Sequence, residues 1–261
     1  MDTLDTNIKH CRSCIQGRTI FPFTMAFQPI VDIHEHRIVA YEALVRGTAG
    51  EGAAQVLARV TDENRYAFDQ SCRVRAIELA ARLGMADCGP GLHNDVRLNI
   101  NFLPNAVYEP KACIRLTLET ASRTGFPLDR LTFEFVEHEE IADSRHTLNI
   151  IQEYRKHGFR IAMDDFATGY SGLSRLATLK PDIVKLDRDL VQDCDNDHIR
   201  LATIAAIVAL GRELGIKVVC EGVERHAEYA ALRSIGARYI QGYYFARPKF
   251  EGLVRDAEID Y

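Results

Sequence analysis

The 261-residue chain repeats one plan: an apolar run of strand length, a polar residue near the end of that run, and then a loop with an amphipathic segment. The eight runs lie at residues 25–33, 37–45, 97–102, 130–137, 160–165, 182–187, 217–222 and 238–243. Strands that alternate with helices form parallel sheets, so this plan predicts an α/β protein with a TIM-like (β/α)8 barrel. An open doubly wound sheet is the alternative, but no glycine-rich phosphate loop follows any run.

The link between the first two runs is short, with only His34, Glu35 and His36 between them. A parallel crossover needs a dozen or more residues, whereas a hairpin needs very few. We therefore expect the barrel to contain an antiparallel first strand.

Two segments between the runs predict helices. The first carries apolar residues around Tyr154 and ends at Gly158, where a C-terminal cap would lie. The second, residues 199–214, has a wide apolar sector, which predicts a helix that packs on two sides, in the core or in a dimer.

Hydrophobic residues make up 47% of the chain, which is enough for one barrel-sized core. We expect an N-terminal extension at 1–24 and the barrel at 25–261. Seven scattered cysteines indicate reduced thiols rather than a disulfide framework. Cys11 and Cys14 form a CxxC, which could be half of a zinc or redox site or part of a mobile lead-in segment.

The net charge is -5 and the pI is about 6.0, without a basic tail, which argues against polymeric nucleic acid as a partner. The polar partners should be small molecules. No apolar stretch approaches the roughly 18 residues of a membrane span, and the N-terminus lacks the plan of a signal peptide. We expect a cytoplasmic protein.

Polar residues recur near the C-terminal ends of the runs, at intervals of about one strand-helix unit. They are Asn101, Glu134, Asp164, Lys185, Glu221 and Gln241, and Glu42 on the second run joins them. In a barrel these residues would meet at the mouth where active sites lie. Each alone reads more readily as a cap, turn former or surface charge. Equivalent positions in consecutive units favour a shared site.

Five carboxylates would crowd this mouth: Glu42, Glu134, Asp164, Asp165 and Glu221. Unless cations intervene, mutual repulsion would raise their pKa values until some became protonated. Two divalent ions together with Lys185 would balance the five charges. Since the candidate ligands are oxygen donors, Mg²⁺ or Mn²⁺ is favoured over Zn²⁺. Two ions bridged by one carboxylate, here Asp164, suit phosphoryl displacement by water, with Asp165 facing the second ion.

The motifs resemble those of EAL-domain phosphodiesterases, which act on the bacterial second messenger cyclic di-GMP. Residues 41–46 (YEALVR) are similar to the signature that names the family. The other similar stretches are 28–32 (QPIVD), the strand of Asn101, 134–137 (EFVE), 164–166 (DDF), 185–187 (KLD), 221–224 (EGVE) and 241–243 (QGY). They occur in the family's order over residues 25–248.

The resemblance implies a barrel with a reversed first strand and hydrolysis of cyclic di-GMP to linear pGpG. It implies a first metal held by Glu42, Asn101, Glu134 and Asp164, and a second held by Asp164 and Asp165. Glu221 and Lys185 would position and deprotonate the water, with Gln241 beside it. Gln28 and Arg46 would contact the dinucleotide, Arg46 through a phosphate.

The segment from Phe166 through Ala167, Thr168 and Gly169 to Ser174 resembles the family's loop that couples metal binding to a dimer interface, and Glu137 matches the acid that braces it. Two departures stand out. Ala167 replaces the usual glycine, so a positive φ there would impose strain of roughly 1 kcal/mol or more. Residues 102–104 (FLP) replace a serine-containing turn.

The sequence is compatible with three functions. The first is a phosphodiesterase that uses Mg²⁺ or Mn²⁺ and is poorly served by Ca²⁺, because the longer Ca²⁺ bonds would misplace the water. The second is a receptor that binds cyclic di-GMP and signals to a partner protein without cleaving it. The third is a Mg²⁺-dependent barrel enzyme acting on a sugar phosphate. The resemblance also implies a homodimer, and a regulatory partner could act in trans.

Overall fold

The computed structural model describes residues 21–89, 91–104, 107, 109–136, 144–167 and 172–261. The predictions for Cys11, Cys14, Glu137, Thr168 and Gly169 lie outside the described residues. The division between residues 24 and 25 stays a prediction. Next to it, Phe23 packs on Phe68 with ring centroids 5.2 Å apart.

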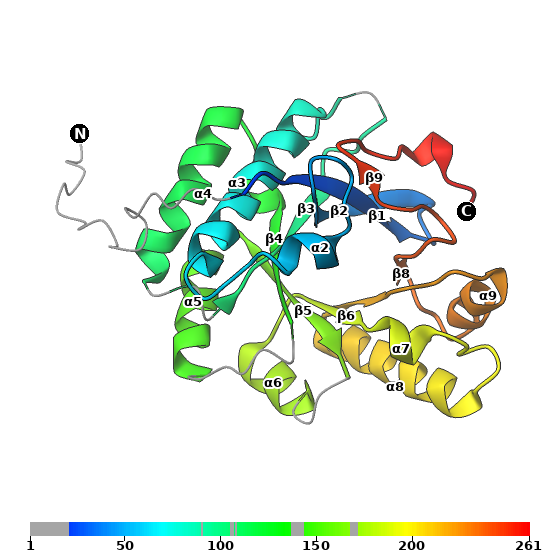
Figure 1. The fold of residues 1–261 in the computed structure, drawn as a ribbon. Coiled ribbons are helices and arrows are strands. Elements are labelled where there is room, and N and C mark those ends of the chain that lie inside the picture. The colour runs from blue at the N-terminus through cyan, green and yellow to red at the C-terminus, as the bar shows by residue number, and fades with distance from the viewer. Residues whose placement is uncertain (1–20, 90, 105–106, 108, 137–143, 168–171) are drawn as a thin grey trace.

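Eight strands close into a barrel, which confirms the predicted fold (Figure 1). The strands are β1 Thr24–Asp32, β2 Arg37–Arg46, β3 Arg97–Asn101, β4 Leu131–Val136, β5 Arg160–Phe166, β6 Ile183–Leu186, β7 Lys217–Cys220 and β8 Tyr239–Ile240. Neighbours around the barrel run in the order β2, β3, β4, β5, β6, β7, β8, β1, and the β1–β2 pairing closes it. A ninth strand, β9 (Lys249–Phe250), pairs with β1 outside this ring.

Strand β1 is antiparallel to both β2 and β8, whereas β2 to β8 are parallel to one another. In the tight link after β1, the Asp32 carboxylate accepts hydrogen bonds from the backbone N–H of His34 at 3.0 Å and of Glu35 at 3.2 Å. Such Asx geometry stabilises a sharp reversal. The hairpin prediction is therefore confirmed.

Helices surround the strands (Figure 1). They are α2 Ala53–Leu57, α3 Arg65–Arg82, α4 Pro110–Thr124, α5 Ser144–Lys156, α6 Gly172–Leu179, α7 Arg188–Val191, α8 His198–Leu214 and α9 His226–Ser234, with short 3₁₀ turns at Leu128–Arg130 and Asp256–Glu258. Gly158 follows α5 with φ 84°, so the predicted end of that helix is correct. Among the described residues, no helix is long and apolar enough to cross a bilayer.

Among the described residues, helix α8 packs on β7 and also contacts α7. Ile204, Val208 and Gly211 are buried, and a Cβ at Gly211 would lie 2.4 Å from Val218, so the helix rests closely on β7. Ile199 and Leu214 are 65% and 51% exposed. Packing on a second side stays a prediction, because β7 and α7 leave part of the apolar sector exposed.

A buried ion pair fixes the segment that follows β3. The Arg73 guanidinium donates to Asp69 at 2.5 Å and to the Tyr154 hydroxyl at 2.6 Å, and it is fully buried. The other Asp69 oxygen accepts from the backbone N–H of Leu103 at 2.9 Å. The pair thereby holds the turn directly after Asn101.

Asp69→Ala is expected to lower the free energy of unfolding by about 3–5 kcal/mol, because it leaves Arg73 as an uncompensated buried charge. Urea denaturation measures this. Asp62→Ala, which breaks the exposed pair with Arg65, is the matched control and should cost at most about 1 kcal/mol. Equal costs in the two variants would contradict the assignment.

Candidate active site

The barrel interior has layers, because side chains on a strand alternate between its two faces. The middle layer is small and apolar: Ile30, Ala40, Ala162, Ile183 and Val219. Two residues further toward the mouth on those same strands, the inward positions are Gln28, Glu42, Asp164, Lys185 and Glu221. Strand periodicity therefore places these five polar residues together at one end of the barrel.

Lys185 lies at the centre of four carboxylates and is 1% exposed. The distances from its Nζ to Glu221, Glu134, Glu42 and Asp164 are 2.7, 3.0, 3.2 and 3.3 Å. Burial alone would lower the pKa of Lys185, but the surrounding carboxylates raise it well above its ordinary value. Lys185 is therefore a fixed positive charge within the mouth.

One ammonium group cannot keep all of these acids ionised. Burial raises the pKa of Glu134 to about 8 despite Lys185, and burial likewise raises the pKa values of Asp164 and Glu221. Burial opposes ionisation of Glu42 as well. There, Lys185 and hydrogen bonds from Gln241 at 2.8 Å and Asn101 at 3.0 Å bring the pKa below its ordinary value. The single positive charge of Lys185 is therefore too little to neutralise the acids of the mouth.

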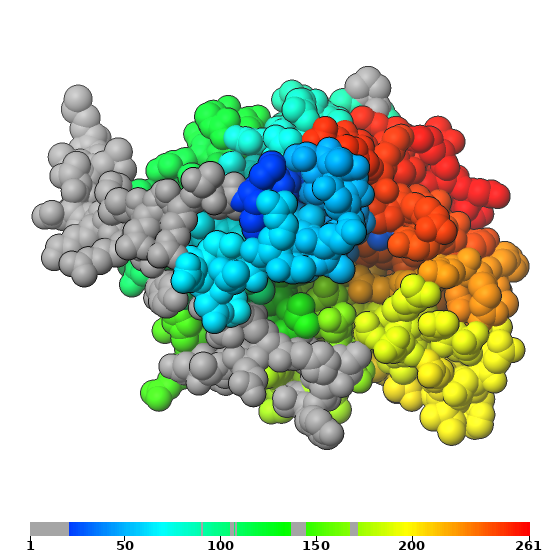
Figure 2. Space-filling view, in the orientation of Figure 1, coloured from blue at the N-terminus to red at the C-terminus, as the bar shows by residue number. Residues whose placement is uncertain are grey.

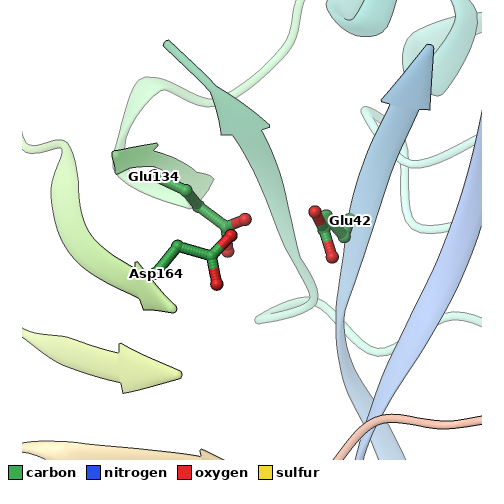
Figure 3. Close-up of side chains that lie close together, drawn as sticks. All are labelled: Glu42, Glu134 and Asp164. Atoms are coloured by element: carbon green, nitrogen blue, oxygen red, sulfur yellow. The ribbon is translucent and has the colours of Figure 1, made fainter. Parts of the chain in front are cut away.

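The carboxylates form two sets whose oxygens could each hold a cation. Oxygens of Glu42, Glu134 and Asp164 lie within 4.8 Å of one another, as do those of Asp164, Asp165 and Glu221. Figure 3 shows the carboxylates of Glu134 and Asp164 side by side, with Glu42 turned toward them from β2. The donors are all oxygens and they need cations, so the residues fit two hard divalent ions. Asp164 belongs to both sets.

The end of β5 has an unusual backbone. Asp165 has φ 52° and Ala167 has φ 76°, on either side of Phe166, which is buried in the core. Ala167 therefore has a positive φ, which is the condition under which the sequence predicts strain at this position. Burial raises the pKa of Asp165 to about 6, with the charges of Asp164 and Asp187 adding to the effect. The strained turn brings this carboxylate to the mouth.

Ala167→Gly is expected to raise the free energy of unfolding by up to about 1 kcal/mol, because glycine adopts positive φ without a Cβ clash. The control is Ala230→Gly on the exposed side of α9, which should lower stability by about 1 kcal/mol as in any helix. Urea titrations of both variants measure the difference. A loss of stability at position 167 would show that the strain argument is wrong.

Asn99 is a site residue that the sequence interpretation missed. It is fully buried, and its Nδ2 donates to Glu134 Oε1 at 2.7 Å. Its own Oδ1 has no hydrogen-bond partner among the described residues. Asn99 and Asn101 are two residues apart and therefore share the inward face, which is the signal that could have revealed it.

The two predicted substrate contacts differ in placement. Gln28 lines the mouth, where it donates to the carbonyl of Ala246 at 3.1 Å and accepts from Gln241 at 3.4 Å. Arg46 is the last residue of β2 and donates to the carbonyl of Val45 at 2.7 Å. It does not line the mouth cavity in the described residues.

The mouth cavity has a volume of about 280 Å³. Two further residues line it. Arg188 pairs with Glu224 at 3.1 Å, and the ring centroid of Tyr243 lies 4.2 Å from the Arg247 guanidinium carbon. Sequence reasoning did not identify these residues as part of the site. In Figure 2, the blue segment around α2, the yellow segment around α7 and the orange-to-red segment after β8 come together on the face shown.

Comparison with known proteins identifies the family. The model of the EAL domain matches residues 21–248. A standalone EAL protein from Vibrio cholerae O395, solved with c-di-GMP bound, is 47% identical, with a TM-score of 0.84 over 91% of this chain and 97% of that chain. Klebsiella pneumoniae BlrP1, solved as a manganese/cy-diGMP complex, is 32% identical, with a TM-score of 0.82 over 94% of this chain and 59% of that chain. The chain belongs to the EAL domain family.

The curated relatives are longer than this chain. The cyclic di-GMP phosphodiesterase NbdA of Pseudomonas aeruginosa is 28% identical over 232 residues, which is 85% of this chain and 28% of NbdA. The chain spans 30% to 60% of the length of three other curated relatives. Activities of those whole proteins therefore transfer only as proposals.

Proposed function

We propose that the protein is a metal-dependent phosphodiesterase that hydrolyses cyclic di-GMP to linear pGpG. The observation that carries this proposal is the pair of carboxylate sets that share Asp164 beneath an open cavity. Two similar solved structures support the choice of substrate. The Vibrio cholerae EAL protein was solved with c-di-GMP bound, and BlrP1 was solved as a manganese/cy-diGMP complex.

Glu42, Glu134 and Asp164 would hold one ion, with Asn101 completing that set, while Asp164 and Asp165 would hold the other. When bound, two such ions acidify a water molecule and neutralise charge on the phosphodiester oxygens. Mg²⁺ or Mn²⁺ would occupy both positions.

The protein groups would act on the water and the substrate. Glu221 Oε1 lies 2.7 Å from Lys185 Nζ in a direct ion pair, and both residues line the mouth cavity, so both groups would contact a water molecule bound beside the pair. The raised pKa of Glu221 suits a carboxylate that accepts a proton from that water. Gln241 would orient the Glu42 carboxylate, to which it donates. Gln28 and Arg46 would contact the dinucleotide.

The test is incubation of chelator-treated protein with cyclic di-GMP and Mn²⁺, followed by chromatography of the nucleotides. Linear product is expected with Mn²⁺ or Mg²⁺ and little with Ca²⁺. Glu42→Ala should abolish turnover, because one metal set loses a ligand. Tight nucleotide binding without product, unchanged in Glu221→Ala, would instead identify a receptor. Turnover of a sugar phosphate with no response to cyclic dinucleotides would mark the third candidate.

We also propose a homodimer, because α8 leaves the apolar side chains of Ile199 and Leu214 exposed. Sedimentation of wild-type protein and of Ile199→Glu tests this proposal. A cytoplasmic location and a regulatory partner in trans stay predictions.

A further inference from the structure

Basic residues begin three of the barrel strands at the end opposite the acidic mouth. Arg97, Arg160 and Lys217 are the first residues of β3, β5 and β7. They precede Asn101, Asp164 and Glu221 by four residues each, so they share the inward face with those site residues. Four residues of strand span about 13 Å. The barrel therefore has an acidic mouth and a basic rim, which we define as Arg97, Arg160 and Lys217.

The positive charges of the basic rim form few ion pairs with carboxylates of the described residues. Arg97 donates to neutral acceptors, Thr132 Oγ1 at 2.9 Å and the Leu131 carbonyl at 2.7 Å. The Lys217 ammonium lies 4.8 Å from the centroid of the Tyr239 ring. Within the described part of the chain, neither Arg160 nor Lys217 has a carboxylate at ion-pair distance.

The rim cations also repel one another. Burial and, to a smaller extent, the neighbouring charge of Arg160 together lower the pKa of Arg97 to about 9. Burial together with Arg160, Arg97 and Arg238 lowers the pKa of Lys217. Acids close by offset part of this repulsion, since Asp129 and Asp182 raise the pKa of Arg97 and Asp32 raises that of Lys217. Two of these acids also have other partners: Asp32 accepts from Arg238 at 2.7 Å, and Asp182 pairs with Arg155 at 3.5 Å.

A cavity of about 360 Å³ opens beside Lys217, at the C-terminal end of α8. Its lining includes Arg212, Arg238, His34 and Tyr239, and of the basic rim it includes Lys217 but neither Arg97 nor Arg160. This volume lies within the range of small-molecule sites, roughly 300–1,000 Å³. Arg212 reaches over Gly236, where an added Cβ would lie 3.0 Å from its Nη2.

The N-terminal face of such barrels commonly carries residues that stabilise the fold, and the pair between Arg238 and Asp32 fits that role. Uncompensated cations that repel one another in a partly buried position do not stabilise a fold. A bound dianion would compensate them, and guanidinium groups match the geometry of phosphate. We propose that the cavity beside Lys217, under the positive charge of the basic rim and of Arg212, binds a small phosphate-bearing anion at a site separate from the acidic mouth.

The test is calorimetric titration of pyrophosphate into protein freed of metal by chelation and desalting, in a phosphate-free zwitterionic buffer. Without metal, the acidic mouth repels pyrophosphate, so the heat measured reports binding at the basic rim. One pyrophosphate per chain is expected, and Lys217→Gln and Arg160→Gln should each weaken binding at least tenfold. Lys249→Gln, which removes an exposed lysine paired with Glu258, is the control and should not change affinity. Absence of binding to the wild-type protein, or wild-type affinity in both rim variants, would overturn the proposal.

A second measurement needs no variant and covers the case in which a rim variant fails to fold. Pyrophosphate should slow acetylation of Lys217 in the wild-type protein at least fivefold, as followed by peptide mass spectrometry, while Lys249 reacts at an unchanged rate. Equal rates at Lys217 with and without pyrophosphate would refute the site. Titrations with orthophosphate and GMP distinguish the two sources of phosphate: tighter binding of GMP indicates a nucleotide, and tighter binding of the inorganic ions indicates free phosphate.

Discussion

Asp164→Asn is expected to reduce hydrolysis of cyclic di-GMP by about a thousandfold or more, because its carboxylate belongs to both oxygen sets. The amide keeps the shape of the side chain, so the fold should persist. Calorimetric titration with Mn²⁺ is the direct measurement, with two ions expected in the wild-type protein and none bound tightly in the variant.

Asp165→Asn is the matched comparison, since Asp165 belongs to one set only. It should lose one ion and keep the other. Two ions bound with wild-type affinity in Asp164→Asn would disprove the shared role of that carboxylate, and thermal unfolding of both variants would establish that they are folded.

Lys185→Met is expected to destabilise the metal-free protein by about 3–5 kcal/mol, because removal of one partner leaves buried carboxylates uncompensated. Mn²⁺ should restore more stability to this variant than to the wild-type protein, since cations then replace the missing ammonium charge. Turnover should stay low even with metal, because the proposed contact to the water is lost. Thermal unfolding with and without Mn²⁺, combined with product assays, measures these effects.

Lys249→Met controls for the loss of a lysine at the surface. It should change neither the stability of the metal-free protein nor its response to Mn²⁺. If Mn²⁺ stabilises Lys185→Met no more than the wild-type protein, then Lys185 does not supply the compensating charge inferred from its four contacts.

The fold follows from patterns that one sequence can show. Apolar runs gave the positions of all eight barrel strands to within a few residues, and the short link at His34 to His36 required the reversed strand. Strand periodicity likewise accounts for the gathering of Glu42, Asp164 and Glu221 at one mouth.

Other features depend on packing across the chain and could not be predicted from local patterns. Asn99 is a neutral side chain in a core strand, and although its spacing from Asn101 indicates the inward face, its bond to Glu134 is visible only in the structure. Asp69 and Arg73 have the spacing of an exposed helical pair, yet the structure buries both. The exposure of Ile199 and Leu214 depends on how much of α8 its neighbours β7 and α7 cover, which the helix's own sequence does not show.

The reversal of β1 also determines where the chain enters the barrel. In an all-parallel barrel the first strand starts at the face remote from catalysis. Here Thr24 lies opposite Arg46 at the C-terminal end of β2, so the polypeptide arrives beside the acidic mouth and departs from β1 at the far end. A sensory module fused ahead of this strand would therefore be tethered at the catalytic face, and its movements would reach the metal ligands through a single hairpin.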